Sequence, residues 1–133
     1  WLLLALALNW VGDTAAYAAG KTLGRRKLAP RLSPAKTWEG AAASLAVSLV
    51  FGYLYLHWLL PEVPGLAGLG VCGAGNVAGQ VGDLAESLMK RGAGVKDSGN
   101  SLPGHGGWLD RLDSTLFTLP VVHVLLVACG WAR

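Results

Sequence analysis

The stretch AAASLAVSLVFGYLYLHWLL, residues 41–60, contains no Asp, Glu, Lys or Arg, and it decides the class of fold. A helix needs about 20 mostly apolar residues to cross the hydrocarbon core of a bilayer. The composition of the whole chain agrees, because 53% of its 133 residues are hydrophobic and only 14% are charged. Soluble domains average about 25% charged residues. The sequence therefore predicts a membrane protein.

Three further apolar windows flank this stretch. Residues 1–20 are apolar apart from two positions, residues 63–82 are uncharged and rich in small side chains, and residues 114–132 carry no formal charge. We therefore expect an all-α, polytopic membrane helix bundle with about four transmembrane helices. Residues 1–133 would form a single membrane-embedded domain.

The basic residues predict the orientation of this bundle. Residues 21–37 contain six Lys or Arg residues and no acid, and the connection from Lys90 to Arg111 contains four. The positive-inside rule places both connections in the cytoplasm and both termini on the other side. Since the same bias orients any membrane protein, it does not indicate a nucleic-acid partner, and none is expected.

Small residues predict close helix packing in the third window. Gly75 and Gly79 form a GxxxG pattern, which lets two helices approach closely in lipid. We interpret this pattern as a packing surface and not as a ligand site.

Four carboxylates are candidates for the chemistry. Asp83 and Glu86 stand three residues apart on one helix face, and Asp110 and Asp113 repeat that spacing where the fourth window begins. Both pairs lie near predicted cytoplasmic helix ends, where they could converge. Uncompensated carboxylates repel and take up protons, whereas Mg²⁺ binds carboxylates together with waters and substrate phosphates. A magnesium site is one interpretation.

A structural role is the alternative for the same side chains. Asp110 could pair with Arg111, and Asp83 with Lys90. Acids near a helix start also interact favourably with the helix dipole. Spacing alone does not separate the two interpretations.

The two basic connections favour phosphate binding. The connection from Lys90 to Arg111 mixes basic side chains with glycines. Glycine lets backbone N–H groups turn toward an anion, and Lys or Arg supplies positive charge to phosphate oxygens. SPAKTWEG, residues 33–40, adds Ser33, Lys36 and Thr37 as phosphate partners. The alternative for SPAKTWEG is a proline-stiffened helix cap, and both roles can hold together.

One long stretch carries a family resemblance. SLMKRGAGVKDSGNSLPGHGGWLDRLD, residues 87–113, resembles the signature of the phosphatidate cytidylyltransferases (CDP-diacylglycerol synthases) almost position for position. GDTAAY (12–17), GRRKLAPRLSPAKTWEG (24–40) and GDLAES (82–87) are also similar to that family. The resemblance covers nearly the whole chain and corresponds to the family's C-terminal, catalytic half, so further N-terminal spans are expected in the full protein.

The resemblance implies a reaction and its partners. CMP would pass from CTP to phosphatidic acid, giving CDP-diacylglycerol and pyrophosphate in phospholipid biosynthesis. Mg²⁺ is the implied cofactor, and a second metal or a monovalent cation stays open. The active site would face the cytoplasm from a bacterial inner (plasma) membrane, because the lipid phosphate lies at the interface and CTP arrives from the cytoplasm. A homodimer also stays open.

The loop chemistry and the resemblance together give the expected site residues. The expected catalytic residues are Asp83, Asp110, Asp113, Lys96 and Arg111, and the three aspartates are also the expected metal ligands. The expected substrate-binding residues are Ser33, Lys36, Thr37, Ser87, Lys90, Arg91, Asp97, Ser98, His105, Gly106 and Gly107.

Two other functions stay open from the sequence. A CTP-dependent lipid kinase would transfer the γ-phosphate and release CDP in place of pyrophosphate. A cation- or proton-coupled transporter would use Asp13 and Asp83 as carboxylates within the membrane. The clustering of most acids on one side favours an enzyme at the membrane interface.

Overall fold

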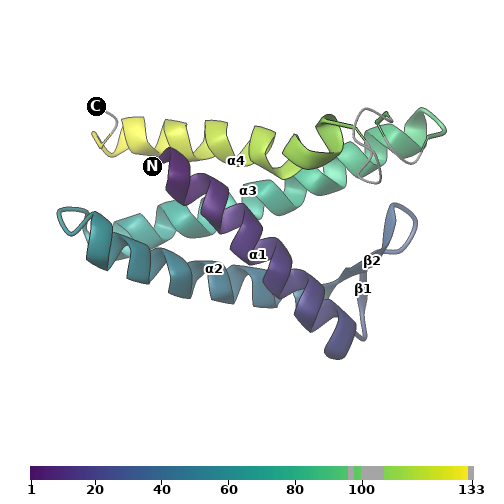
Figure 1. The fold of residues 1–133 in the computed structure, drawn as a ribbon, viewed down its shortest axis with the longest axis horizontal. Coiled ribbons are helices and arrows are strands. Elements are labelled where there is room, and N and C mark those ends of the chain that lie inside the picture. The colour runs from purple at the N-terminus through teal and green to yellow at the C-terminus, as the bar shows by residue number, and fades with distance from the viewer. Residues whose placement is uncertain (96–97, 100–106, 132–133) are drawn as a thin grey trace.

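The computed structural model describes residues 1–95, 98–99 and 107–131, without the side chain of Arg111. Over these ranges the chain forms four helices and a two-stranded hairpin (Figure 1). In chain order the elements are α1 (Leu2–Thr22), β1 (Lys27–Ala29), β2 (Ser33–Thr37), α2 (Trp38–Leu59), α3 (Gly65–Gly92) and α4 (Leu109–Ala128).

The helices follow the four predicted windows, with shifted ends. Among the described residues, α1 and α2 are long and apolar enough to cross a membrane. Helix α3 has 28 residues. It continues ten residues beyond the predicted window, and this extension carries its charged residues. The apolar part of α4, Leu112–Ala128, is shorter, since the helix begins before the uncharged window and includes Asp110 and Asp113 in its first turns.

The expectation of a purely helical chain is wrong for residues 27–37. Strands β1 and β2 pair antiparallel there, with Lys27 opposite Thr37. The hairpin is tied to the start of α2: the backbone N–H of Trp38 donates to the Arg26 carbonyl at 3.0 Å. The Arg26 N–H in turn donates to the Glu39 carboxylate at 3.2 Å. Backbone pairing thus gives this basic connection a fixed shape.

Polar and small side chains form most of the buried face of α2. The buried face of α2 consists of Gly40, Ser44, Ser48, Gly52 and Leu56. The large side chains of α2, such as Val50, Tyr53 and Trp58, are exposed instead. A water-soluble amphipathic helix has the opposite arrangement.

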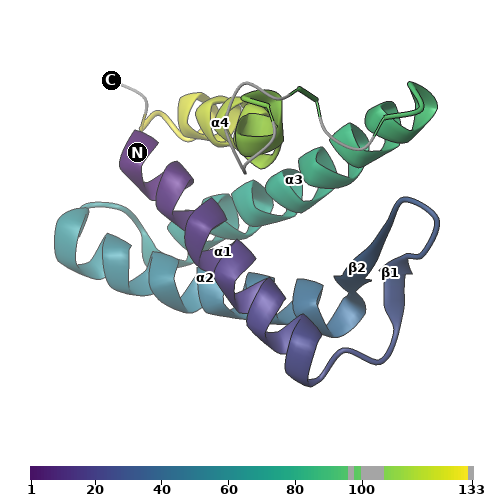
Figure 2. The same cartoon turned by 45° about the vertical axis from the view of Figure 1, so that its right-hand side comes forward.

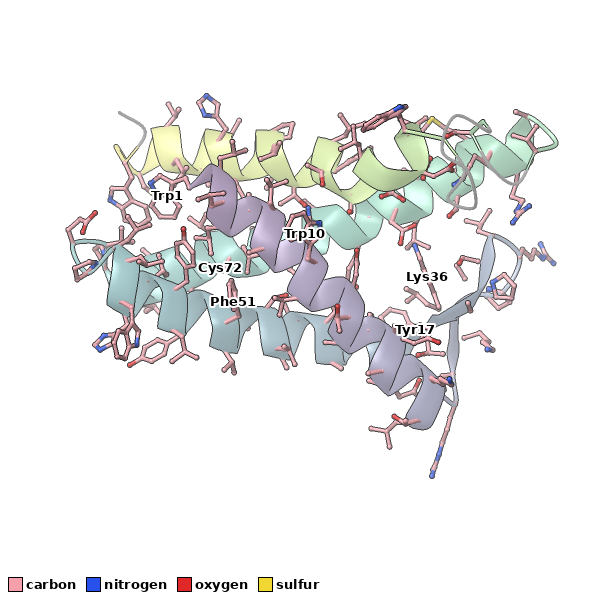
Figure 3. The ribbon with its side chains drawn as sticks, viewed as in Figure 1. Trp1, Trp10, Tyr17, Lys36, Phe51 and Cys72 are labelled. Carbon is pink, nitrogen blue, oxygen red and sulfur yellow. The ribbon has the colours of Figure 1, made fainter. Side chains whose placement is uncertain are left out.

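An apolar cluster packs the end of the bundle that holds the two termini. Leu4, Leu8, Leu56, Val63 and Cys72 form this core, and the rings of Trp1 and Trp131 stack at 6.0 Å. Figure 3 shows Trp1, Phe51 and Cys72 in this region. Cys72 is fully buried within this core.

The predicted packing role of the glycines in α3 is confirmed. A Cβ atom on Gly75 would lie 2.9 Å from Val122 of α4, and one on Gly79 would lie 2.7 Å from Asn9 of α1. The hydroxyl of Thr118 donates to Asn9 at 2.9 Å across the same junction. Figure 2 shows α1 crossing α2 and α3, with its N-terminal end close to α4. The absence of side chains at these glycines lets α1, α3 and α4 meet.

The opposite end of the molecule gathers elements that are distant in sequence. The end of α1, the hairpin, the end of α3 and the start of α4 all lie toward the right in Figure 1. The hairpin connection and the described residues of the connection from Lys90 to Arg111 therefore share one end of the bundle, away from the termini, as the charge distribution predicted.

Candidate functional site

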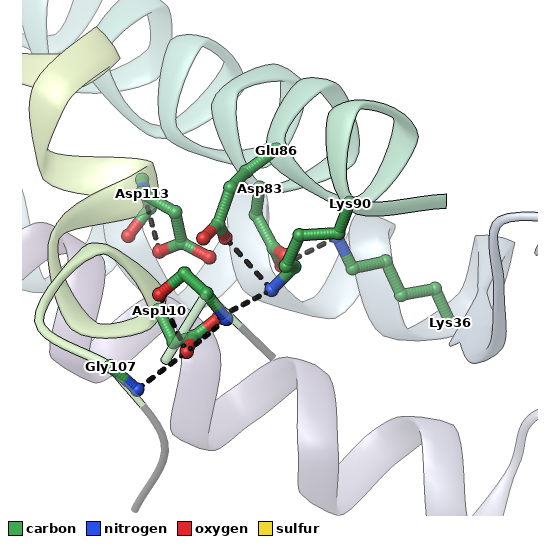
Figure 4. Close-up of polar contacts among 9 residues, drawn as sticks. Lys36, Asp83, Glu86, Lys90, Gly107, Asp110 and Asp113 are labelled. Atoms are coloured by element: carbon green, nitrogen blue, oxygen red, sulfur yellow. Dashed lines mark hydrogen bonds and ion pairs between the residues drawn. The ribbon is translucent and has the colours of Figure 1, made fainter. Parts of the chain in front are cut away.

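Charged side chains from three elements meet at this end. Helix α3 contributes Asp83, Glu86 and Lys90, α4 contributes Asp110 and Asp113, and β2 contributes Lys36 (Figure 4). We name these six residues the charged cluster. They come from positions between 36 and 113, so only the tertiary fold brings them together.

Lys36 connects the hairpin to α3. Its Nζ atom lies 2.5 Å from a carboxylate oxygen of Asp83. Figure 3 shows the Lys36 side chain reaching from the hairpin toward the bundle. This contact brings a predicted phosphate ligand beside a predicted metal ligand.

Lys90 does not pair with Asp83, the partner considered in the structural alternative. Its Nζ atom lies 3.2 Å from Glu86 and 2.7 Å from Asp110. All three side chains are largely buried, with exposed fractions of 18%, 3% and 13% for Lys90, Glu86 and Asp110. Lys90 therefore compensates two carboxylates from different helices.

Asp110 is the most heavily bonded member of the charged cluster. Besides Lys90, it accepts hydrogen bonds from the Ser98 N–H at 2.9 Å, the Ser98 hydroxyl at 2.8 Å and the Gly107 N–H at 2.7 Å. The bond from Lys90 and these further donors hold the pKa of Asp110 below its usual range. A Cβ atom on Gly107 would lie 2.9 Å from the Gly99 nitrogen, so a glycine is needed there for this close approach.

Glu86 is the least satisfied member. It is buried, and apart from the ion pair with Lys90 neither carboxylate oxygen has a hydrogen bond among the described residues. Figure 4 shows its carboxylate facing Asp113. Burial, reinforced by Asp113, raises the pKa of Glu86 above its usual range, although Lys90 opposes the change. Glu86 lies beyond the predicted span 63–82, so this charge is at the end of the bundle.

The donor chemistry of the charged cluster fits a hard divalent cation. Its carboxylates offer oxygen atoms only, and the buried Glu86 carboxylate has the Lys90 ion pair at 3.2 Å but no hydrogen bond within the described part of the chain. No three His, Cys, Asp or Glu side chains in that part are arranged to hold a metal ion together. The assignment of metal ligands therefore remains a prediction. It comprises Asp83, Asp110 and Asp113, with Glu86 as an additional oxygen donor.

A pocket opens beside the charged cluster, between α1, the hairpin, α2 and α3. Its volume is about 240 Å³. The polar side chains that line it are Asp13, Tyr17, Lys36, Thr37, Ser44, Gln80 and Asp83. Lys36 and Asp83 belong to both the pocket and the charged cluster, so a ligand in the pocket would extend naturally toward the charges.

Sequence reasoning missed several residues of this pocket. Ser44 and Gln80 lie in the predicted apolar windows, where average hydropathy does not reveal a single polar side chain. The repeat of Gly40, Ser44, Ser48 and Gly52 at four-residue spacing was the available signal for a polar interior. Asp13 was considered only as a transporter carboxylate, although it lies in the motif GDTAAY.

The remaining predicted site residues have varied positions. The Thr37 hydroxyl accepts a hydrogen bond from the Gly40 N–H at 3.1 Å and caps α2. Ser33 begins β2, and Ser87 and Arg91 lie on the last turns of α3. The predictions for Lys96, Asp97, His105 and Gly106, and for the side chain of Arg111, lie outside the described residues.

The fold and the charged cluster define a class: a mostly helical protein with membrane-length apolar helices and a charged site at one end. Within that class, the chain belongs to the cytidylyltransferase family, because a model of this family matches residues 1–129. The sequence resemblance to cytidylyltransferases is therefore confirmed.

Individual relatives agree with the family. The chain is 49% identical over 132 residues to a phosphatidate cytidylyltransferase from Pseudomonas aeruginosa, covering 98% of this chain and 48% of that protein. It is 44% identical over 126 residues to the Bacillus subtilis enzyme of that name, covering 95% and 47%. The Haemophilus influenzae enzyme is 42% identical over 123 residues, covering 90% and 43%. The chain thus spans about half the length of these curated relatives.

Proposed function

We propose that this chain carries the catalytic part of a phosphatidate cytidylyltransferase, which transfers CMP from CTP to phosphatidic acid and releases pyrophosphate. The observation that carries the proposal is the 49% identity to a protein of that name over 98% of the chain. The charged cluster supports it, because two anionic substrates require positive charge and cation-binding oxygens at one place. Membership of the cytidylyltransferase family favours this reaction over a lipid kinase or a transporter.

The same proposal places the bundle in a membrane. Four spans would put the charged cluster at the headgroup level of a bacterial inner membrane, facing the cytoplasm. The apolar side chains on the outside and the polar ones inside support this placement, because the hydrocarbon region favours apolar contacts. Residues 1–133 would act as one catalytic domain.

Mg²⁺ would be held by Asp83, Asp110 and Asp113, with Glu86 as a further oxygen donor. When bound, it supplies positive charge that offsets the phosphates and polarises the α-phosphoryl group. The chain's own contribution is positioning. Lys36 and Lys90 would bind phosphate oxygens and reduce the repulsion between the two anions.

The bond changes need no strong base. A phosphatidate oxygen forms a bond to the α-phosphorus of CTP while the bond from that phosphorus to pyrophosphate breaks. Because a phosphate monoester is already anionic near neutral pH, no side chain has to remove a proton before the attack. The residues of the charged cluster would act by orientation and charge neutralisation.

The test uses membranes that contain the full-length protein, with radiolabelled CTP, phosphatidic acid and Mg²⁺. We expect a labelled CDP-diacylglycerol and free pyrophosphate, and loss of product when EDTA removes the metal. CDP as the released nucleotide would indicate a lipid kinase. Product without divalent metal would contradict the cation site.

The Asp113→Asn variant tests the carboxylates. We expect turnover to fall at least about 100-fold, while insertion into the membrane is retained. Mg²⁺ should also raise the unfolding temperature of the wild type but not of this variant, which is a readout independent of activity. Glu62→Gln is the matched control, since Glu62 lies in the connection at the other end of the bundle and is exposed. Turnover of Asp113→Asn within about threefold of wild type would refute the assignment.

A further inference from the structure

Gln80 occupies an unusual place in the pocket. It lies on α3 in the pocket wall, and its side-chain amide nitrogen makes two hydrogen bonds within the protein. It donates to the carbonyl of Ala41 on α2 at 3.3 Å and to Oδ1 of Asn76 at 2.7 Å. The amide nitrogen has only two hydrogens to give, so both are used.

The orientation of this amide is fixed by the groups around it. The carbonyl of Ala41 can only accept a hydrogen bond. The Nδ2 atom of Asn76 donates to the hydroxyls of Ser44 at 3.0 Å and Ser48 at 2.9 Å, so its Oδ1 is the atom that faces Gln80. Rotating the Gln80 amide by 180° would set oxygen against oxygen at both contacts. The network therefore leaves Oε1 of Gln80 as an acceptor with no donor among the described residues.

The chemistry of this acceptor discriminates between pyrimidines. Cytosine carries an amino group at the position where uracil carries a carbonyl oxygen. A fixed acceptor can bind the amino group, whereas it repels the carbonyl. A buried polar group that loses its partner weakens binding by about tenfold, so one such contact is enough to prefer one base.

We propose that this pocket binds the cytidine end of the nucleotide, with Oε1 of Gln80 accepting a hydrogen bond from the 4-amino group of cytosine. The inference rests on the proposed function, which supplies CTP as the substrate. The pocket suits a single-ring base, because its volume of about 240 Å³ is below the roughly 300–1,000 Å³ of pockets for drug-sized ligands. Ala16, Tyr17 and Leu28 provide apolar surface for the ring.

The position of the pocket fits the rest of the nucleotide. Lys36 and Asp83 line the pocket and also belong to the charged cluster. A nucleotide with its base at Gln80 would therefore direct its phosphates toward the lysines and carboxylates. The competing occupant is the glycerol part of the lipid substrate, and the experiment below separates the two.

The experiment measures displacement of radiolabelled CTP from membranes that contain the full-length protein. The competitors are CTP, UTP and the triphosphate of the 2-pyrimidinone riboside, which lacks only the 4-amino group. For the wild type we expect the 2-pyrimidinone compound to bind about tenfold more weakly than CTP, and UTP to bind more weakly still.

Gln80→Met removes the acceptor and keeps nearly the same length. This variant should bind CTP about tenfold more weakly than the wild type, with the 2-pyrimidinone compound binding as well as CTP. Val77→Met is the matched control, because it places the same side chain one turn earlier on α3, where Val77 is 47% exposed. It should behave as the wild type. Gln80→Asn, which withdraws the acceptor by one methylene, serves if Gln80→Met does not insert.

Two results would overturn the inference. The first is a preference for CTP over the 2-pyrimidinone compound that stays within about twofold of wild type in a Gln80 variant that inserts into the membrane. The second is a Gln80 variant that binds CTP as the wild type does but has a raised KM for phosphatidic acid when turnover is measured, which would assign the pocket to the lipid. A wild type that does not use CTP at all would instead overturn the proposed function.

Discussion

The substitution Gly79→Ala tests whether close packing of α1, α3 and α4 holds the bundle together. The new Cβ atom would lie 2.7 Å from Oδ1 of Asn9 and 2.8 Å from Oγ1 of Thr118. These two atoms are already joined by a hydrogen bond of 2.9 Å. The added methyl group therefore has to separate the helices or break that bond.

The size of the effect follows from three contributions. Overpacking a well-packed interior costs about 1–3 kcal/mol. Loss of an interhelical hydrogen bond in a membrane protein adds about 0.6 kcal/mol. Replacing glycine by alanine within a helix has the opposite effect and stabilises the folded state by about 0.5–1 kcal/mol. We expect Gly79→Ala to lower the free energy of unfolding by about 1–3 kcal/mol in sum.

Gly70→Ala is the matched control in the same helix. A Cβ atom on Gly70 meets nothing within 4 Å, so only the helix-propensity gain of about 0.5–1 kcal/mol should appear. Unfolding is followed by far-UV circular dichroism as SDS is added to mixed micelles. If Gly79→Ala is as stable as Gly70→Ala, the glycines do not set the spacing of these helices.

Two further substitutions test the elements that position the charged cluster. Thr37→Val removes the hydroxyl that caps α2 and should cost about 1 kcal/mol; amide exchange at Gly40 should accelerate, whereas Thr37→Ser should match the wild type. Lys90→Met leaves Glu86 and Asp110 without their shared cation and should cost about 3 kcal/mol. The double variant Lys90→Met/Glu86→Gln should recover part of that loss in the same unfolding assay, and an unchanged stability of Lys90→Met would contradict the pairing.

The apolar windows could be predicted from the sequence because their signal is local. Residues 1–20 and 41–60 correspond to α1 and α2, since hydropathy and length suffice to recognise such helices. The GxxxG pattern at Gly75 and Gly79 likewise gave the correct packing face, because the spacing of small residues is visible in one segment.

Features that depend on distant partners could not be predicted. Contacts between Arg26 and the start of α2 position the hairpin. Its sequence lacks the alternation of apolar and polar residues that would predict strands. Lys36 was expected to bind phosphate. Its ion pair with Asp83 could not be predicted, because the two residues are 47 positions apart and only the tertiary fold brings them together. The pocket at Gln80 was missed because an average over a window conceals a single polar side chain.

The bonding of Asp110 has a consequence for how mutational studies of this family are interpreted. One carboxylate accepts hydrogen bonds from both Ser98 and Gly107, so it holds these two positions beside the start of α4. An inactive Asp110 variant would therefore be expected even if this residue never touched an ion, because Ser98 and Gly107 would lose their shared hydrogen-bond acceptor. Separating the two causes requires a measurement of ion affinity alongside the rate. Loss of rate with intact affinity would show that Asp110 acts by holding Ser98 and Gly107 in place.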